Sequence, residues 1–149
     1  NPTDLQTIIV PFPDGLNEHL GHGDTLGLCA CTAAAPVGAP ALLAAKPSAG
    51  ANQLTWDAVA GASGYDLVRG SLALLRANGG DFALATTDCL ENDLSATSRD
   101  DDDLPSVGAG FWYLVRAVSC GGHASYDSGA PSQVGSRDAE IQSAPVSCP

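Results

Sequence analysis

Apolar and polar residues alternate in short runs from Asn52 onward, a pattern typical of strands with one buried face. In the first run Leu54 and Trp56 share a face, and a Gly-rich turn closes it. Residues 71–77 predict either a short helical turn or an irregular strand, and a further strand is possible at residues 41–45. The spacing of the runs, with Gly, Pro and Asp between them, predicts an all-β antiparallel sandwich. The predicted strands cover residues 53–59, 65–69, 82–87, 111–118 and 132–137.

Composition divides the chain into three parts. Residues 1–31 hold two closely spaced histidines and two cysteines, and we expect an extended or irregular N-terminal arm there. Residues 32–50 are rich in Ala, Pro and Gly with a single charge, which indicates a linker that could include the first strand. Residues 51–149 carry the alternating pattern of the β-domain.

Charge and length exclude two classes of protein. The chain of 149 residues has 17 acidic against 6 basic residues, a net charge of −11, and Lys46 is its single lysine. Nucleic-acid binding needs clustered Lys and Arg, so this class is excluded. No apolar stretch approaches the roughly 20 residues of a membrane-spanning helix, so we expect no membrane span.

The five cysteines indicate the compartment. They show neither C-x-x-C nor zinc-finger spacing, so we expect disulfides and an extracellular or cell-surface location. The odd number predicts one cysteine that stays free or pairs with another chain, unless a removed N-terminal segment carried a sixth. The chain opens on Asn1 rather than Met, which we interpret as a processed N-terminus.

The aromatic residues of the β-region carry a family resemblance. Trp56 in an early strand, Tyr65 at the start of the next, and Tyr113-x-Val115-x-Ala117 later resemble the fibronectin type III-like modules of secreted bacterial proteins, over about residues 41–149. The resemblance implies an immunoglobulin-like sandwich. It also implies that Tyr113 is a corner tyrosine, with its ring in the core and its hydroxyl bound to backbone. Such a fold carries many functions and does not specify one.

The same resemblance implies a disulfide arrangement. In a type III sandwich the loop after the fourth strand and the loop before the last strand lie at one end, which would place Cys89 near Cys120. Cys148 would then pair with Cys29 or Cys31 and join the C-terminal tail to the N-terminal module. Five cysteines allow many pairings, so the sequence does not decide among them.

A second resemblance lies in the N-terminal part. The run HLGHGDTLGxC at residues 19–29 is similar to the end of a short module of secreted bacterial proteins, whose opening Cys-His pair is absent here. His19, His22 and Asp24 are a candidate partial ligand set for Zn²⁺ or Cu²⁺. The alternative is that they brace a Gly-rich turn. His123 is a further candidate ligand, against the alternative of a solvated loop histidine.

The densest charge run is Arg99 followed by Asp100, Asp101, Asp102 and Asp103. Together with the acidic segment at residues 91–93, these four carboxylates could supply oxygen ligands to Ca²⁺. They lack the spacing that wraps a single ion. The alternative is a solvated loop.

No motif for catalysis is present: the chain has no G-x-S-x-G, and none of its three histidines sits in a recognisable triad. We therefore expect no enzyme. The favoured function is a secreted structural module that associates with copies of itself or neighbouring extracellular chains, as the subunit of a filament or matrix polymer. The alternative is a glycan- or protein-binding accessory module with Trp112 and Tyr126 as contact residues. Alternation places Trp112 opposite Phe111 and Tyr113, where a loop or the arm could instead cover it.

Overall fold

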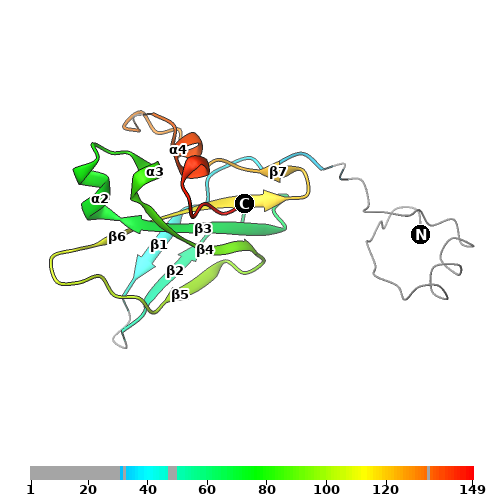
Figure 1. The fold of residues 1–149 in the computed structure, drawn as a ribbon. Helices are drawn as coiled ribbons and strands as arrows, with labels where there is room; N and C mark the ends of the chain where they lie inside the picture. Colours follow the sequence, from blue (N-terminus) through cyan, green and yellow to red (C-terminus); the bar gives the residue numbers. More distant parts are fainter. Residues whose placement is uncertain (1–30, 32, 47–49, 134) are drawn as a thin grey trace, which may run out of the picture. The chain divides into compact units, whose positions relative to one another are not determined.

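The computed structural model describes residues 31, 33–46, 50–133 and 135–149 (Figure 1). The chain divides into two units, Asn1–Thr32 and Ala33–Pro149, and the second is described below. Within the described residues, no helix has the length and apolar character needed to cross a bilayer.

Two antiparallel sheets form an all-β sandwich in the second unit. The first sheet has the order β1-β2-β5, with β1 at Leu42–Ala45, β2 at Asn52–Trp56 and β5 at Ser98–Asp101. The second has the order β4-β3-β6-β7, built from Thr86–Leu94, Gly64–Ser71, Phe111–Ser119 and Gly122–His123, respectively. The sandwich predicted from the alternating pattern is confirmed. Over the described ranges, three short helices accompany it: α2 (Leu72–Ala77), α3 (Phe82–Ala85) and α4 (Arg137–Ser143).

The main core lies between the two sheets. Leu54 and Trp56 of β2 face Tyr65 and Leu67 of β3, and the inward residues of β6 complete the cluster. The rings of Trp56 and Tyr65 pack edge to face with centroids 5.7 Å apart. Alternation along β2 and β3 therefore identified the inward residues of these two strands correctly.

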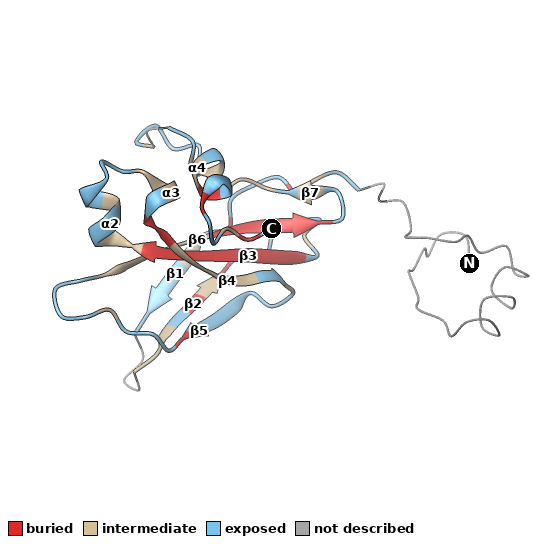
Figure 2. Ribbon diagram, in the orientation of Figure 1, coloured by how far each residue is buried: buried red, intermediate tan, exposed pale blue. Residues whose placement is uncertain are grey.

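A second, smaller core covers the outer face of the four-stranded sheet. Val68 of β3 packs there with Tyr126, with Ile141 of α4, and with Cys148 near the C-terminus. Strand β3 is consequently buried on both faces and runs red along nearly its whole length in Figure 2. The same two-sided covering explains why residues 111–118 form a nearly continuous apolar run rather than an alternating one.

Several predicted elements differ from the structure. Residues 82–85 form α3 rather than a strand, because the Asp81 carboxylate accepts hydrogen bonds from the N–H groups of Ala83 (2.8 Å) and Leu84 (3.3 Å) and caps a helical turn. Residues 72–77 take the helical alternative, with Ser71 as cap. The described residues of 132–137 form no strand and lead into α4, so the last described strand is the two-residue β7.

Most of the predicted linker belongs to the sandwich unit. Strand β1 pairs with β2, Pro36 and Pro40 are buried, and the Ala34 carbonyl accepts a hydrogen bond from Ser119 Oγ at 3.3 Å. The small residues allow this close approach, since a Cβ on Gly121 would overlap the Ala33 carbonyl oxygen. The Ala/Pro composition thus reflects tight packing as well as an extended backbone.

Candidate functional site

Arg69 centres a charge network at one end of the sandwich interior. It follows Tyr65 and Leu67 on the inward face of β3, and its Nη1 lies 2.9 Å from Asp101 Oδ1 and 2.8 Å from Asp103 Oδ2. Its Nη2 lies 2.7 Å from Asp88 Oδ2 on β4. The network therefore connects β3 and β4 of one sheet with β5 of the other.

These contacts shift the pKa values of the groups involved. Burial disfavours the charged guanidinium of Arg69, but the hydrogen bonds to Asp88, Asp103 and Asp101 outweigh burial and raise its pKa. Burial likewise opposes ionisation of Asp88, yet the hydrogen bond from Arg69 lowers the pKa of that carboxyl group. Burial and the neighbouring Asp101 carboxylate together raise the pKa of Tyr113.

Tyr113 departs from the corner-tyrosine prediction. Its ring packs against the main core, as expected, but its hydroxyl donates to Asp101 Oδ2 at 2.8 Å and accepts from Asn52 Nδ2 at 3.3 Å. The partners are side chains rather than backbone, because the end of β5 brings a buried carboxylate within reach. Tyr65 makes the hydroxyl-to-backbone contact instead, accepting from the Val59 N–H at 2.9 Å.

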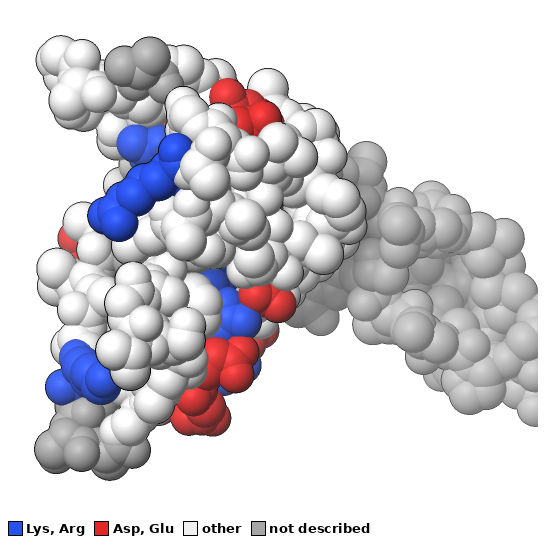
Figure 3. All heavy atoms as spheres, turned by 60° about the vertical axis from the view of Figure 1, so that its left-hand side comes forward, with Lys and Arg blue, Asp and Glu red and all other residues white. Residues whose placement is uncertain are grey.

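The acidic run is only partly a loop. Asp100 and Asp101 end strand β5, where they pair with Gln53 and Asn52 of β2. Asp101 and Asp103 both form ion pairs with Arg69, and Figure 3 shows basic and acidic side chains side by side on one face. Among the described residues, no group of three or more His, Cys, Asp or Glu side chains is arranged to hold a metal ion. Calcium binding by Asp100, Asp101, Asp102 and Asp103 stays a prediction.

A second buried ion pair lies on the opposite face of β3. Arg116 Nη2 of β6 is 2.7 Å from Asp66 Oδ2, and the Asp66 side chain is fully buried. Asp66 also accepts a hydrogen bond from the Asp93 N–H at 3.1 Å, and Arg116 lies 4.8 Å from the centre of the Tyr126 ring. His123 Nε2 is 4.0 Å from Asp66 Oδ2, so this candidate metal ligand lies beside an ion pair.

The disulfides correct the predicted pairing. Cys89 of β4 bonds to Cys148, not to Cys120, because the C-terminal segment crosses the outer face of the second sheet and ends over β4. Cys31 and Cys120 are also disulfide-bonded, so every cysteine that the structure describes is oxidised. Cys29, like the candidate ligands His19, His22 and Asp24, lies outside the described residues. The oxidised cysteines are compatible with an extracellular protein.

The two proposed aromatic contact residues are not exposed. Trp112 lies on the face of β6 opposite Tyr113, as alternation predicted, but it packs edge to face against Phe82 of α3 with ring centroids 5.0 Å apart. Tyr126 is only 3% exposed, and burial raises the pKa of its hydroxyl. Both rings therefore belong to the second core. Among the described residues, helix α3 contributes the ring that covers Trp112.

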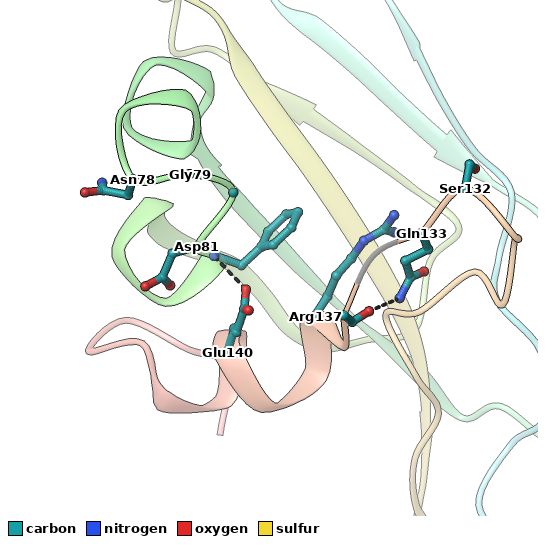
Figure 4. Close-up of a pocket in the computed structure, with 10 residues that line it drawn as sticks. Asn78, Gly79, Asp81, Ser132, Gln133, Arg137 and Glu140 are labelled. Carbon is teal, nitrogen blue, oxygen red and sulfur yellow. Dashed lines mark hydrogen bonds between the residues drawn. The ribbon is translucent and has the colours of Figure 1, made fainter.

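A polar cleft opens where the second core meets solvent (Figure 4). Its volume is about 510 Å³, and it lies between the turn that joins α2 to α3 and the segment that enters α4. Glu140 reaches from α4 and accepts a hydrogen bond from the Phe82 N–H at 2.8 Å. The cleft is lined by Asn78, Gly79, Gly80, Asp81, Phe82, Ser132, Gln133, Gly135, Arg137 and Glu140.

Hydrogen bonds from one loop build the second wall of this cleft. Gln133 accepts from the Ser128 N–H at 2.8 Å, and its amide nitrogen donates to Asp127 and to the Gly135 carbonyl. Asp127 also accepts from the Arg137 N–H at 2.8 Å. Burial opposes ionisation of Asp127, but the hydrogen bonds from the Arg137 backbone and from the Ser136 and Gln133 side chains together outweigh burial and lower the pKa of the carboxyl group.

The edges of the sheets differ in how they are protected. Strand β5 presents Ser98, Arg99 and Asp100 as exposed residues at one edge of the first sheet. Strand β1, at the other edge, has the sequence LLAA and no charge, and Leu43 is 70% exposed. Among the described residues, no strand pairs with the outer side of β1.

No family model matches the chain. No curated protein matches it either. Among solved structures, it is similar to an Fn3-like protein from Clostridium thermocellum, with 29% identity over 61% of this chain and 84% of that one, and a TM-score of 0.45. The sandwich assignment rests on the strand order and register of this chain.

Sequence reasoning missed the buried charges. Arg69 lies two residues beyond Leu67 in an alternating strand, so the pattern already placed it inward. A charge at an inward position needs a buried partner. That signal indicates a pairing with the acidic residues, whereas the acidic run by itself indicates calcium ligands or solvated side chains.

Proposed function

We propose that this chain is an extracellular, non-catalytic structural module that associates with a second copy of itself through the free edge of β1. The observation that supports the proposal is the unprotected edge itself. An edge strand presents unpaired N–H and C=O groups, and proteins usually guard such strands with charge, proline, bulges or short length. Strand β1 is short, with four residues, but it lacks charge, proline and a bulge.

The other edges carry those guards. Strand β5 has charged exposed residues, β7 is two residues long, and β4 has register shifts along its pairing with β3. The difference singles out β1 for association. Its sequence also suits a copy of itself, since neither strand would bring a charge opposite a like charge.

Antiparallel pairing of two β1 strands around a two-fold axis preserves the faces of both sheets when Leu43 faces Leu43. Leu42 then lies opposite Ala44, which places a large side chain against a small one. The two Lys46 side chains fall at opposite ends of the pair. Four paired residues bury little surface, so we expect a weak dimer whose formation depends on concentration.

Such a contact closes on itself and makes a dimer rather than a filament. A filament or matrix polymer requires a second, different contact on each module. The N-terminal arm predicted for residues 1–31 is the candidate for it, with or without a metal ion at the histidines. Because the chain carries a net charge of −11, added salt should favour either contact by screening repulsion.

Sedimentation velocity of the full chain at rising concentration tests the β1 contact. We expect a monomer–dimer equilibrium that shifts toward dimer at higher salt. Leu43→Lys places like charges opposite each other and should give a monomer throughout. The control Val107→Lys makes the same change at a fully exposed loop residue and should leave the equilibrium unchanged.

Two results would refute the proposal. One is a wild-type chain that stays monomeric at all concentrations. The other is equal dimerisation of the Leu43→Lys and Val107→Lys variants, since the contact would then lie elsewhere on the molecule. Equal thermal melting of both variants and the wild type confirms that the fold is retained.

A further inference from the structure

The polar cleft between α3 and α4 contains hydrogen-bonding atoms that the described residues leave open. Asp81 uses Oδ1 to cap α3, and Glu140 uses Oε2 to bind the Phe82 N–H. Asn78 donates its amide nitrogen to the Leu74 carbonyl at 2.9 Å. This leaves one oxygen on each of these three side chains without a partner among the described residues; that of Glu140 lies at the cleft, whereas Asn78 and Asp81 point away from Arg137 in Figure 4.

Arg137 provides the donors of the same cleft. Its Nη1 donates to the Tyr126 carbonyl at 3.3 Å, and its guanidinium lies 5.8 Å from the centre of the Phe82 ring. Within the described residues it forms no ion pair, in contrast to Arg69, Arg99 and Arg116. Its remaining N–H groups are therefore available at the wall of the cleft, as Figure 4 shows for its side chain.

The mixed charge of the cleft selects the class of ligand. An anion would bind Arg137 but would be repelled by Asp81 and Glu140. A cation would be attracted by these two carboxylates but would be repelled by Arg137. A hydroxyl group both donates and accepts, so a neutral ligand with several hydroxyls can satisfy both kinds of group at once. Phe82 adds an apolar surface of the kind that sugar rings contact.

Size and access agree with a small ligand. The volume of about 510 Å³ lies within the range of roughly 300–1,000 Å³ that is usual for small-molecule sites. Gly79, Gly80 and Gly135 all have positive φ, and nothing lies within 4 Å of where their Cβ atoms would be. The backbone at these positions is thus open to close approach by a ligand.

We propose that the cleft between α3 and α4 is a binding site for an uncharged saccharide, held by Arg137 as donor and by Glu140 as acceptor. This site is separate from the β1 edge, so either proposal can fail without the other. The saccharide would be a segment or end of a neutral glycan.

NMR titration of the full chain with maltotetraose, cellotetraose, chitotetraose and tetragalacturonate tests the site. We expect at least one neutral tetrasaccharide to shift the amide signals of residues 78–82 and 132–140, and the charged tetragalacturonate to bind more weakly. Arg137→Ala should weaken that binding about tenfold, the usual effect of losing one or two good hydrogen bonds. Arg76→Ala, an arginine change at an exposed residue of α2, is the matched control.

Glu140→Gln keeps the shape of the side chain and its hydrogen bond from the Phe82 N–H. This second variant keeps the site testable if the Arg137→Ala variant does not fold. It should weaken neutral saccharide binding and reduce the discrimination against tetragalacturonate. The proposal is overturned if no neutral tetrasaccharide shifts the cleft amides, or if Arg137→Ala and Arg76→Ala bind equally. Stronger binding of tetragalacturonate than of every neutral sugar would also overturn it.

Discussion

Replacing Arg69 by Met tests whether the buried charge network holds the two sheets together. The change keeps an unbranched side chain of similar length but removes the positive charge that Asp88, Asp101 and Asp103 share. The Asp101 side chain is only 5% exposed, so its carboxylate would remain in the interior without a counter-ion. Breaking a buried pair in this way typically costs about 3–5 kcal/mol.

The structure places the expected loss near the lower end of that range. Asp101 would keep the hydrogen bonds from the Tyr113 hydroxyl and from the Asp103 N–H (3.1 Å), which partly stabilise the charge. Loss of the contact between the Arg69 guanidinium and the Phe111 ring, 4.6 Å from its centroid, adds about 0.5–1 kcal/mol. We therefore expect the free energy of unfolding to fall by about 3–4 kcal/mol at pH 7.

Denaturant titration followed by tryptophan fluorescence measures this change. Both tryptophans, Trp56 and Trp112, lie in the sandwich, so the signal reports on this unit alone. The matched control is Arg99→Met, because the Arg99–Glu91 pair has a 2.6 Å contact on partly exposed side chains. Such a pair contributes about 0–1 kcal/mol. If both variants lose the same stability, the reasoning that burial makes the Arg69 network different is wrong.

Three further changes follow from the same structure. Cys148→Ser breaks the bond to Cys89, which spans 59 residues, and should cost about 4 kcal/mol in a denaturant titration by the loop-entropy relation. Gly70→Ala should cost about 3 kcal/mol or more, measured in the same way, since its Cβ would overlap the Trp112 ring and the Ala85 carbonyl oxygen. The lowered pKa of Asp88 should give full stability above about pH 5 and a decline below about pH 4, because protonation removes its bond to the arginine. Unfolding titrations between about pH 3 and 7 measure this, and a flat profile would contradict it.

The sequence predicted those parts of the fold that depend on one alternating face. In β2 and β3 the period of two placed Leu54, Trp56, Tyr65 and Leu67 correctly, because each strand has a clear inward side. The family resemblance implied the immunoglobulin-like form of the sandwich and the inward ring of Tyr113. It could not supply the hydroxyl partner of Tyr113, which depends on how far β5 extends.

The predictions that were wrong concern segments whose secondary structure or disulfide partner depends on helix capping or on a residue distant in the sequence. Phe82 and the residues after it alternate like a strand, yet the Asp81 cap and the Glu140 carboxylate hold them as a helical turn. The Cys89–Cys148 bond depends on where α4 leads the tail, and no local pattern records that path. The sequence does not predict a strand at residues 98–101, because their charged side chains are typical of a solvated loop. In each case a tertiary contact overrides local sequence preference.

The charge balance takes on a different meaning once the pairs are located. All six basic residues lie in the described part of the chain, and Arg69, Arg99 and Arg116 are each bound to carboxylates. Their charge holds strands together, so it offers nothing to an external anion. Three cations remain: Lys46 beyond β1, Arg76 on α2 and Arg137 in the cleft. Within the described residues, Arg137 is the one of these three that has no ion-pair partner and also lines a cleft. A small polar ligand therefore finds directional hydrogen-bond donors in the cleft rather than on the acidic surface.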